Sequence, residues 1–384
     1  MDETGNSGVP AAIARYRKPG EGFFRRFRNG FMRTLVSSSS GSSDPALDIE
    51  RPEELLAYLR AQGLLGPEDR PAMRTLSGGV SNRAVLVEIP PRAPFVVKQA
   101  LSRLRVAVEW RAEPARIHRE ARALEYLSAL IPSGAVPQLL FEDRRHHLIG
   151  MSAVPQPHRN WKDLLLEGQL SLDHVGQFAT LLGTIHSRSS VDPGLARGEF
   201  ADQSFFESLR LEPYYRYSAQ EVVSARTFFG RLIEETLAAR LALVHGDYSP
   251  KNILIYRDGL VLLDHEVVHF GDPAFDVGFS LTHLLSKALH VTGRRRDFLE
   301  AARIYVRRYL ECLEGLEWGG ELEPRAVRHT LGCMLARVVG RSPLEYLAPA
   351  EQETLVRLVV QWIPHPQRRL SDLIDAFSEE LDCQ

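Results

Sequence analysis

The sequence lacks most of the features that would assign it to a specialised class of protein. Three cysteines occur among its 384 residues, at Cys312, Cys333 and Cys383, and this sparse, odd set suits a reducing cytoplasm and forms no metal-ligand pair. Apolar runs long enough to span a membrane are absent, and the start at Met1–Glu3 lacks the apolar segment of a signal peptide. We therefore expect a cytoplasmic protein without stable membrane insertion.

A large excess of charge of one sign is also missing. The formal net charge is −2, which offers no argument for a nucleic-acid partner. Hydrophobic residues make up 44% and charged residues 25% of the chain, as is ordinary for a globular protein, and the length allows one large domain or two lobes. Nothing in this composition sets the oligomeric state.

Residues 1–45 differ in composition from the rest of the chain. Arginines alternate there with phenylalanines, and the serine-rich stretch Ser37–Ser43 follows. Such a stretch is typical of a disordered basic tail with a flexible linker, or of a start codon assigned too far upstream. Binding of the tail to an anionic membrane surface or to a partner is the alternative.

The segment 243–279 carries most of the chemistry in the sequence. A short apolar run leads into His245–Asp247, and Asn252 follows five residues after Asp247. Two apolar runs, 253–256 and 260–263, are joined by Arg257–Gly259, which predicts a hairpin with a three-residue loop and glycine at a positive φ. Asp264 stands directly after the second run, so the hairpin would fold it back toward Asn252.

This order of residues suits phosphoryl transfer. That reaction needs one carboxylate to orient the attacking hydroxyl and hard oxygen ligands to hold Mg²⁺ against the phosphates. In protein kinases the base aspartate precedes a metal-binding asparagine by five residues, and a second metal-binding aspartate follows. The alternative is that these are polar turn residues at strand ends, which would explain one aspartate more easily than the whole series.

These motifs resemble a known superfamily. His245–Asp247 with Asn252, then Asp264 and Gly271–Asp276, are similar to the aminoglycoside phosphotransferase, choline kinase and methylthioribose kinase superfamily. The resemblance implies a protein-kinase-like α+β fold of two lobes, with a small antiparallel sheet in the N-terminal lobe and a mostly helical C-terminal lobe. It also implies ATP and Mg²⁺ as cofactors and a small-molecule hydroxyl acceptor.

The resemblance assigns roles residue by residue. Asp247 would be the catalytic base, and Asn252 and Asp264 would bind Mg²⁺. The Asp-x-Glu form of 264–266 is similar to the choline and methylthioribose kinase branches, which makes Glu266 an additional metal contact. Asp276 would brace the catalytic loop, while His265 is expected to pack rather than to react.

The N-terminal lobe, expected over residues 46–150, contains a second group of candidates. A turn at Ser77–Asn82 includes Gly78 and Gly79, whose backbone N–H groups could approach phosphates. Considered without its neighbours, this turn fits a plain hairpin equally well. The strand ending in Lys98 resembles the kinase strand whose lysine contacts the α- and β-phosphates. Its predicted partner is Glu120, and Glu113 and Glu125 are the alternatives.

The segment that links the two lobes should bind the base of the nucleotide. Residues 147–154 read as a strand and crossover, and the resemblance implies adenine recognition by backbone groups of Met151, Ser152 and Ala153. Lys98–Leu101 and the pair Arg116–Ile117 are similar to methylthioribose kinases in particular, whereas the asparagine at Asn252 departs from that branch.

The C-terminal lobe, expected over residues 151–384, should carry the acceptor. Helical periodicity recurs from residue 160 onward, and His186 is expected to be a buried, hydrogen-bonded histidine at the end of a helix. Arg210 and Arg216 stand in an aromatic-rich stretch at 199–217, and Arg337 and Arg341 lie where the family often builds its acceptor pocket. Packing and surface ion pairs remain the alternatives for all of them.

The sequence therefore predicts an ATP-dependent phosphotransferase acting on a hydroxyl of a small polar molecule, such as the sugar methylthioribose. An aminoglycoside or other antibiotic kinase is the first alternative. The acceptor pocket of such an enzyme should be acidic, and Arg210, Arg216, Arg337 and Arg341 argue against a polycationic acceptor. A catalytically silent nucleotide-binding scaffold is the second. A protein kinase is weaker, because no Ala-Pro-Glu segment follows Asp264.

Overall fold

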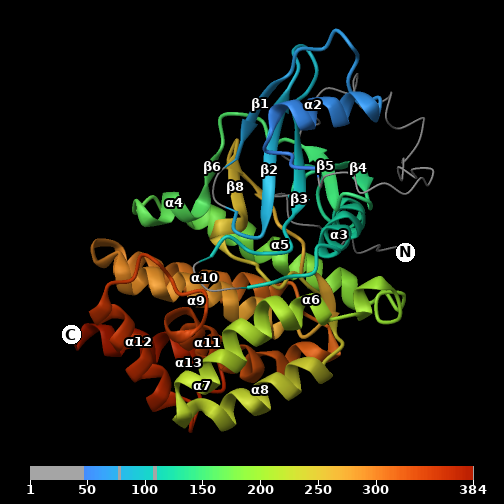
Figure 1. Ribbon diagram of the computed structural model, residues 1–384. Coiled ribbons are helices and arrows are strands. Elements are labelled where there is room, and N and C mark those ends of the chain that lie inside the picture. The colour runs from blue at the N-terminus through green and yellow to red at the C-terminus, as the bar shows by residue number, and fades with distance from the viewer. Residues whose placement is uncertain (1–46, 77–78, 107–109, 384) are drawn as a thin grey trace, which may run out of the picture.

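The structure is a computed structural model that describes residues 47–76, 79–106 and 110–383 (Figure 1). The expected tail at residues 1–45 and the candidate Gly78 lie outside the described residues. The chain forms an antiparallel sheet with two helices, which we call the N-terminal lobe, followed by a larger, mostly helical lobe below it in Figure 1.

The N-terminal lobe is built on a sheet in the order β1-β2-β3-β5-β4, with neighbouring strands antiparallel. Its strands are β1 (Ala72–Thr75), β2 (Asn82–Glu88), β3 (Phe95–Ala100), β4 (Leu139–Asp143) and β5 (Leu148–Ser152). The strand β5 lies inside the sheet between β3 and β4, so the interlobe segment leaves from an interior strand and not from an edge.

Two helices pack on this sheet. The helix α2 (Pro52–Ala61) starts at a proline, which suits the first helical position, and stops before Gly63 at φ +68°. The helix α3 (Arg116–Leu130) carries the predicted Glu120. Its expected apolar face is buried, because Ile117, Ala121, Leu124 and Leu127 all lie in the core.

The helical lobe holds the remaining elements. Its strands form two small sheets, β10-β7 and β6-β8-β9, from β6 (Arg159–Asn160), β7 (Ala242–Val244), β8 (Ile253–Tyr256), β9 (Gly259–Leu262) and β10 (His269–Gly271). Its α-helices are α4 (Trp161–Leu166), α5 (Leu172–Ser190), α6 (Ser204–Phe206), α7 (Tyr217–Glu221), α8 (Arg226–Ala238), α9 (Ala274–His290), α10 (Arg295–Glu311), α11 (Leu322–Val339), α12 (Pro349–Trp362) and α13 (Leu370–Asp382). A π-helical stretch, η3, spans Glu207–Arg216.

The helix α9 is the centre of this lobe. Residues from Ala274 to Leu289 are buried along it, so it is covered on all sides, as expected for a helix without a polar face. The helix begins at Ala274, directly after Pro273, and the Asp272 side chain accepts a hydrogen bond from the Ala274 N–H at 3.0 Å.

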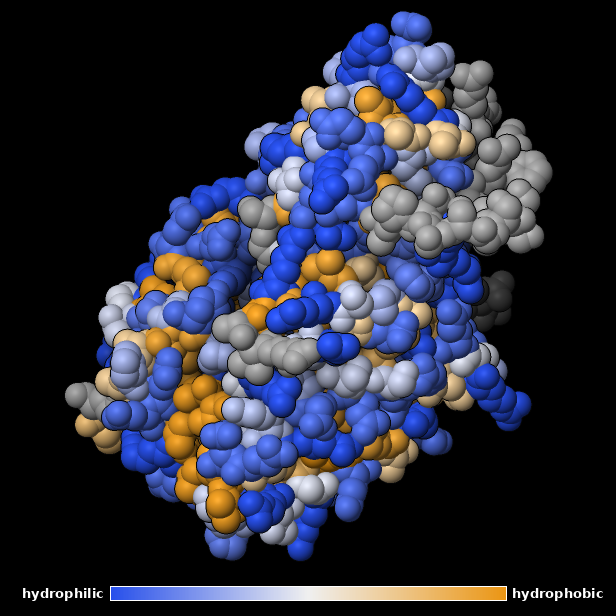
Figure 2. Space-filling model, viewed as in Figure 1, coloured by the Kyte–Doolittle hydropathy of each residue, from blue (hydrophilic) through white to orange (hydrophobic). Residues whose placement is uncertain are grey.

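The lobes share one hydrophobic core. A small separate cluster lies between α2 and the sheet, whereas the α3 side of the sheet is continuous with the interior of the helical lobe. The face drawn in Figure 2 is largely hydrophilic, with hydrophobic residues gathered mainly on the helical lobe. Among the described residues, every helix is too short or too polar to cross a membrane.

Candidate active site

Lys98 forms two ion pairs, one within the N-terminal lobe and one with the helical lobe. Its Nζ lies 2.9 and 2.6 Å from the Glu120 carboxylate oxygens and 2.7 Å from Asp264 Oδ1. The strand β3 positions Lys98, α3 positions Glu120, and the segment after β9 positions Asp264. The rivals Glu113 and Glu125 do not contact Lys98 in this arrangement, since Glu113 is exposed and Glu125 pairs with Arg122 at 2.7 Å.

Burial and charge act in opposite directions on this cluster. Desolvation disfavours the Lys98 ammonium, but the Asp264 and Glu120 carboxylates outweigh it and raise the pKa of Lys98 above its usual value. Burial likewise disfavours the charged form of Asp264, yet Lys98 and Lys251 hold the pKa of that carboxyl well below its ordinary range. A cation held by two carboxylates is therefore fixed as a cation at neutral pH.

Asp247 is held from two sides. The Asn252 amide donates to Asp247 Oδ2 at 2.8 Å and to its backbone carbonyl at 2.9 Å. The Arg210 guanidinium lies 3.0 Å from the same Oδ2 and also donates to the Gly246 carbonyl at 2.8 Å. Both side-chain contacts use Oδ2, and within the described chain no hydrogen bond reaches Oδ1, which stays available to accept a proton.

The turn at residues 245–247 has a physical reason for its glycine. Gly246 adopts φ +77°, and a Cβ at this position would lie 2.8 Å from Val267 Cγ2. Asp276, in the first turn of α9, accepts hydrogen bonds from the His245 and Gly246 N–H groups at 2.6 and 2.8 Å. This agrees with the bracing role that the resemblance implied for Asp276.

His186 and His265 are both packing residues. His186 is fully buried and hydrogen-bonds Tyr309 at 2.7 Å and Asp276 at 3.2 Å, as expected. It does not end its helix, however, because α5 continues to Ser190. His265 is also fully buried, and burial lowers its pKa well below the usual value, so it stays neutral.

The hairpin β8–β9 brings Asn252 and Asp264 to the same place. Ile253 pairs with Leu262, and the Leu263 N–H donates to the Asn252 carbonyl at 2.9 Å. The loop is shorter than predicted. Tyr256 pairs with Gly259, so Arg257 and Asp258 form a two-residue turn at φ +48° and +61°, and the positive φ does not fall on the glycine.

Asp264 itself has a strained backbone, with φ +66°. A non-glycine residue in the left-handed region costs free energy and persists only where its surroundings hold it. Here the ion pair with Lys98 accompanies it, with Asp264 Oδ1 2.7 Å from Lys98 Nζ.

Glu266 is held by partners that the sequence did not suggest. The Arg116 Nε donates to Glu266 Oε2 at 2.9 Å, and the Asn82 amide donates to the same oxygen at 2.9 Å. Arg116 is fully buried and also donates to the backbone carbonyls of Ser81 and Leu101. Glu266 therefore ties the segment after β9 to Asn82 and to the backbone around Ser81, and its role as a metal ligand stays a prediction.

The residues predicted to bind the nucleotide lie around this network. Gly79 is exposed at the start of the turn that ends in Ser81 and Asn82. Met151 and Ser152 end β5, and Ala153 follows. The N–H groups of Ser152 and Ala153 already donate to the Gln138 and Pro94 carbonyls at 2.9 and 3.2 Å. Adenine recognition there stays a prediction, and it would have to use other backbone groups of this segment.

The oxygen donors fit a magnesium nucleotide. Mg²⁺ is usually bound by one or two protein carboxylates together with phosphate oxygens and water, rather than by a cage of protein ligands. Asp264 and the Asn252 amide oxygen supply that kind of donor beside Lys98 and Asp247. Consistent with such a sparse set, the described residues contain no cluster of three or more histidine, cysteine, aspartate or glutamate side chains suited to a metal.

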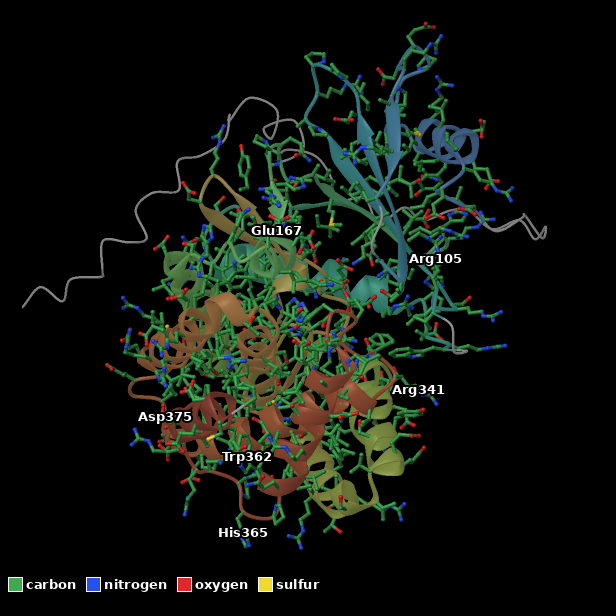
Figure 3. All side chains as sticks on the ribbon, turned by 90° about the vertical axis from the view of Figure 1, so that its left-hand side faces the viewer. Arg105, Glu167, Arg341, Trp362, His365 and Asp375 are labelled. Carbon is green, nitrogen blue, oxygen red and sulfur yellow. The ribbon has the colours of Figure 1, made fainter. Side chains whose placement is uncertain are left out.

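The arginines expected near the acceptor lie in different settings. Arg210, on η3, is buried and contacts Asp247, a pairing that the sequence did not indicate. Arg216 pairs with Glu207 and Glu212. Arg337 is buried against Tyr214 and Ser342, whereas Arg341 lies over the Tyr217 ring at the surface of the helical lobe (Figure 3).

Solved structures with a similar fold are small-molecule kinases. Plasmodium vivax ethanolamine kinase is 12% identical, with a TM-score of 0.50, and the match covers 82% of this chain and 90% of that chain. An amicoumacin kinase in complex with AMP-PNP and Ca²⁺ is 15% identical, with a TM-score of 0.50, and covers 81% of this chain and 94% of its own. These likenesses show the kinase-like α+β fold that the sequence predicts.

Sequence comparison reaches the same superfamily. Methylthioribose kinases 2 and 1 of Oryza sativa subsp. japonica are each 25% identical over 263 residues, which is 60% of this chain. The match spans 61% of the length of those relatives. A family model described as "Phosphotransferase enzyme family" matches residues 72–322, more than half of the chain and the whole of the site described above. The chain therefore belongs to the phosphotransferase enzyme family.

Proposed function

We propose that this protein transfers the γ-phosphoryl group of Mg²⁺-ATP to a hydroxyl of a small polar molecule. The observation that carries the proposal is the meeting of Lys98, Glu120 and Asp264 from three separate elements, beside the Asn252–Asp247 pair. Burying a lysine between two carboxylates costs desolvation free energy, so a lysine without a function would be expected to stay exposed to solvent. The amicoumacin kinase solved with AMP-PNP supports the choice of an adenine nucleotide.

Each residue has a distinct task in this proposal. Lys98, held by Glu120, would steady the α- and β-phosphates, and Asn252 and Asp264 would hold Mg²⁺. The metal, when bound, neutralises phosphate charge. Asp247 Oδ1 would accept the proton of the acceptor hydroxyl, while Arg210 and Asn252 fix the carboxylate through Oδ2. Catalysis of this kind depends mainly on positioning and electrostatics.

The rice relatives support a sugar as the acceptor, methylthioribose being the first to test. An aminoglycoside acceptor is less well supported, because polycations need acidic surroundings. The side chain in direct contact with Asp247 is instead the cationic Arg210, and Lys251 stands four residues further on in the chain.

The proposal is tested by ADP release with Mg²⁺-ATP and a panel of sugars, amino alcohols and aminoglycosides. We expect turnover with at least one acceptor, and a loss of roughly 10²-fold or more in kcat for Asp247→Asn, because a general base is removed. Asp297→Asn, on the surface of α10 where the residue pairs with Arg294, is the matched control and should keep full activity.

Binding of nucleotide must be measured beside turnover. Tight binding of Mg²⁺-ATP with no ADP release on any acceptor would contradict the phosphotransferase proposal and favour a nucleotide-binding scaffold. Equal activity of Asp247→Asn and the unaltered protein would remove the base assignment while leaving the reaction class intact.

A further inference from the structure

The helical lobe contains a buried lysine that has no carboxylate partner among the residues that the structure describes. Lys287, on α9, is fully buried, and its Nζ makes one long hydrogen bond, 3.4 Å to the His283 carbonyl. The ammonium also lies 5.2 Å from the centre of the Tyr346 ring. Because an ammonium has three donors and is costly to bury unpaired, this position is unfavourable unless something else compensates it.

The charged neighbours of Lys287 further disfavour its buried ammonium group. Burial, together with the nearby charges of Lys162 and Arg337, lowers the pKa of Lys287 to about 7, and Glu345 opposes this shift. Glu345 is itself paired with Lys162. Arg337, 8% exposed, donates to Tyr214 and Ser342, and within the described chain it has no carboxylate partner. These cations therefore exceed the acidic groups near them.

One polar group around the lysine is also left without a partner. Among the described residues, the buried His283 Nε2 makes no hydrogen bond, whereas the Ser286 and Tyr346 hydroxyls contact each other. Buried polar groups are normally satisfied, so an unpaired ring nitrogen beside the unpaired Lys287 and Arg337 cations points to a ligand that accepts hydrogen bonds and carries negative charge. We call Lys287, Arg337, Lys162 and Tyr346 the cationic cluster.

The cationic cluster adjoins the reacting carboxylate. The guanidinium groups of Arg337 and Arg210 lie 5.6 and 5.9 Å from the centre of the same Tyr214 ring, and Arg210 lies 3.0 Å from Asp247. Lys251, in the catalytic loop, is close enough to influence both His283 and Asp264 electrostatically. One small molecule could thus place a hydroxyl at Asp247 and another group at the cluster.

We propose that the cationic cluster binds the acceptor and that the acceptor is a polyol bearing an anionic group, a carboxylate or a phosphate, apart from the hydroxyl that is phosphorylated. This inference rests on the proposed function, since it assigns the other end of that same acceptor. It differs from the choice of methylthioribose, which is a neutral sugar.

The test compares acceptors that differ only in the acidic group. Glucose is compared with gluconate and glucose 6-phosphate, ribose with ribose 5-phosphate, and methylthioribose is included as the neutral candidate. Thermal-shift binding is measured with AMP-PNP and Mg²⁺, and ADP release with ATP. We expect an acidic member to bind at least about tenfold more tightly than its neutral parent, which is the size of one charge-assisted hydrogen bond.

Lys287→Met separates a binding role from a packing role, because it keeps the length of the side chain and removes its charge. We expect it to raise the KM for the acidic acceptor at least about tenfold and to leave the affinity for AMP-PNP unchanged. Arg357→Met, which removes an exposed cation of α12 paired with Glu380 at 3.2 Å, is the control and should leave both values unchanged.

The outcomes distinguish this inference from the proposed function. Preference for a neutral acceptor, or an acidic acceptor whose binding Lys287→Met does not weaken, would overturn the inference while the phosphotransferase stands. If no acceptor gives ADP release, a thermal shift by gluconate or glucose 6-phosphate that Lys287→Met abolishes would still support the inference. If none of the acidic compounds shifts the melting temperature, the inference is overturned. The comparison of gluconate with the sugar phosphates shows which acidic group is bound.

Discussion

The ion pair between Arg116 and Glu266 connects two parts of the site that the sequence separates by 150 positions. Arg116 is 0% exposed at its side chain and Glu266 4%, so neither charge is solvated by water. The same arginine donates to the carbonyls of Ser81 and Leu101, and Asn82 donates to Glu266. The backbone around Ser81 and the segment that carries Glu266 are therefore held together by one buried guanidinium.

The first prediction concerns this pair. Arg116→Met should destabilise the protein by roughly 3–5 kcal/mol, because it leaves the Glu266 carboxylate buried without its cation. Adding Glu266→Gln to that variant should recover part of the loss, since the uncompensated charge is then removed. Denaturant unfolding of the two single variants and the double variant measures the coupling between the residues.

If the double variant were as unstable as the sum of the single variants, the pair would contribute no coupling, and Arg116 would act only through the backbone carbonyls it contacts. The same set also bears on Glu266 as a metal ligand. A metal role predicts that Glu266→Gln raises the Mg²⁺ concentration needed for ADP release, whereas Arg116→Met should change that requirement less.

Local patterns in the sequence explain why some site residues could be predicted and others could not. Lys98 and Glu120 each stand at a fixed place in a short pattern, a strand end and a helix with one apolar face, so their meeting could be expected. Arg116 and Arg210 have no such pattern. Their partners, Glu266 and Asp247, lie 150 and 37 positions away, and a buried long-range ion pair leaves no trace in local periodicity.

At the scale of elements, prediction succeeded where periodicity is strong and failed where turn geometry decides. The hairpin β8–β9 follows from two apolar runs, but its turn uses Arg257 and Asp258 at positive φ, which residue preference does not favour. The stretch η3 contains Pro213 inside a π-helical segment, and the propensities for regular helix do not anticipate it. In both places tertiary contacts override local preference.

The packing of α9 against α11 supplies the prediction at this scale. A Cβ added to Gly278 of α9 would lie 2.6 Å from both His329 Cβ and the Thr330 backbone nitrogen of α11. Gly278→Ala should therefore force the two helices apart and cost roughly 1–3 kcal/mol, as overpacking does. Thermal unfolding measures the loss.

Gly230→Ala in α8 is the matched control, because this helical glycine has no atom within 4 Å of an added Cβ. It should stabilise the protein by about 0.5–1 kcal/mol, since alanine is the better helix former. Equal effects of the two substitutions would show that the α9–α11 contact yields easily and that the close approach at Gly278 has no energetic weight.

For the whole molecule, the continuous core joins the α3 side of the N-terminal lobe to the helical lobe. Lys98, Glu120 and Asp264 lie at this junction, so the interior that unites the lobes also positions the residues proposed to bind the nucleotide. The sequence predicted two lobes with separate tasks but not this shared interior, because pairing of apolar faces across distant segments is a property of the folded chain.

Lys287 makes the stability of the whole molecule dependent on pH. Its pKa is about 7 in the folded protein and about 10.4 in an unfolded chain. Between these values the unfolded state binds more protons than the folded state, so the free energy of unfolding should rise with pH, by at most about 1.4 kcal/mol per pH unit. Below pH 7 both states are protonated, and the cost of the buried charge is present in full.

The charged and titratable groups that face Lys287 do not obscure this window. Burial opposes ionisation of Glu345, but its hydrogen bond with Lys162 holds the pKa of that carboxyl below its usual value. Burial lowers the pKa of His283 well below 6.5, and burial raises the pKa of Tyr346 above its usual value. We expect Lys287→Met to be more stable than the unaltered protein at pH 6, and this advantage to shrink steadily toward pH 9. Denaturant unfolding of both proteins at each pH measures the difference in the free energy of unfolding, in which the other titrating groups cancel.

An advantage that stayed constant from pH 6 to pH 9 would mean that the Lys287 ammonium does not titrate in this range. The folded protein would then already supply the negative partner that the acceptor is proposed to bring.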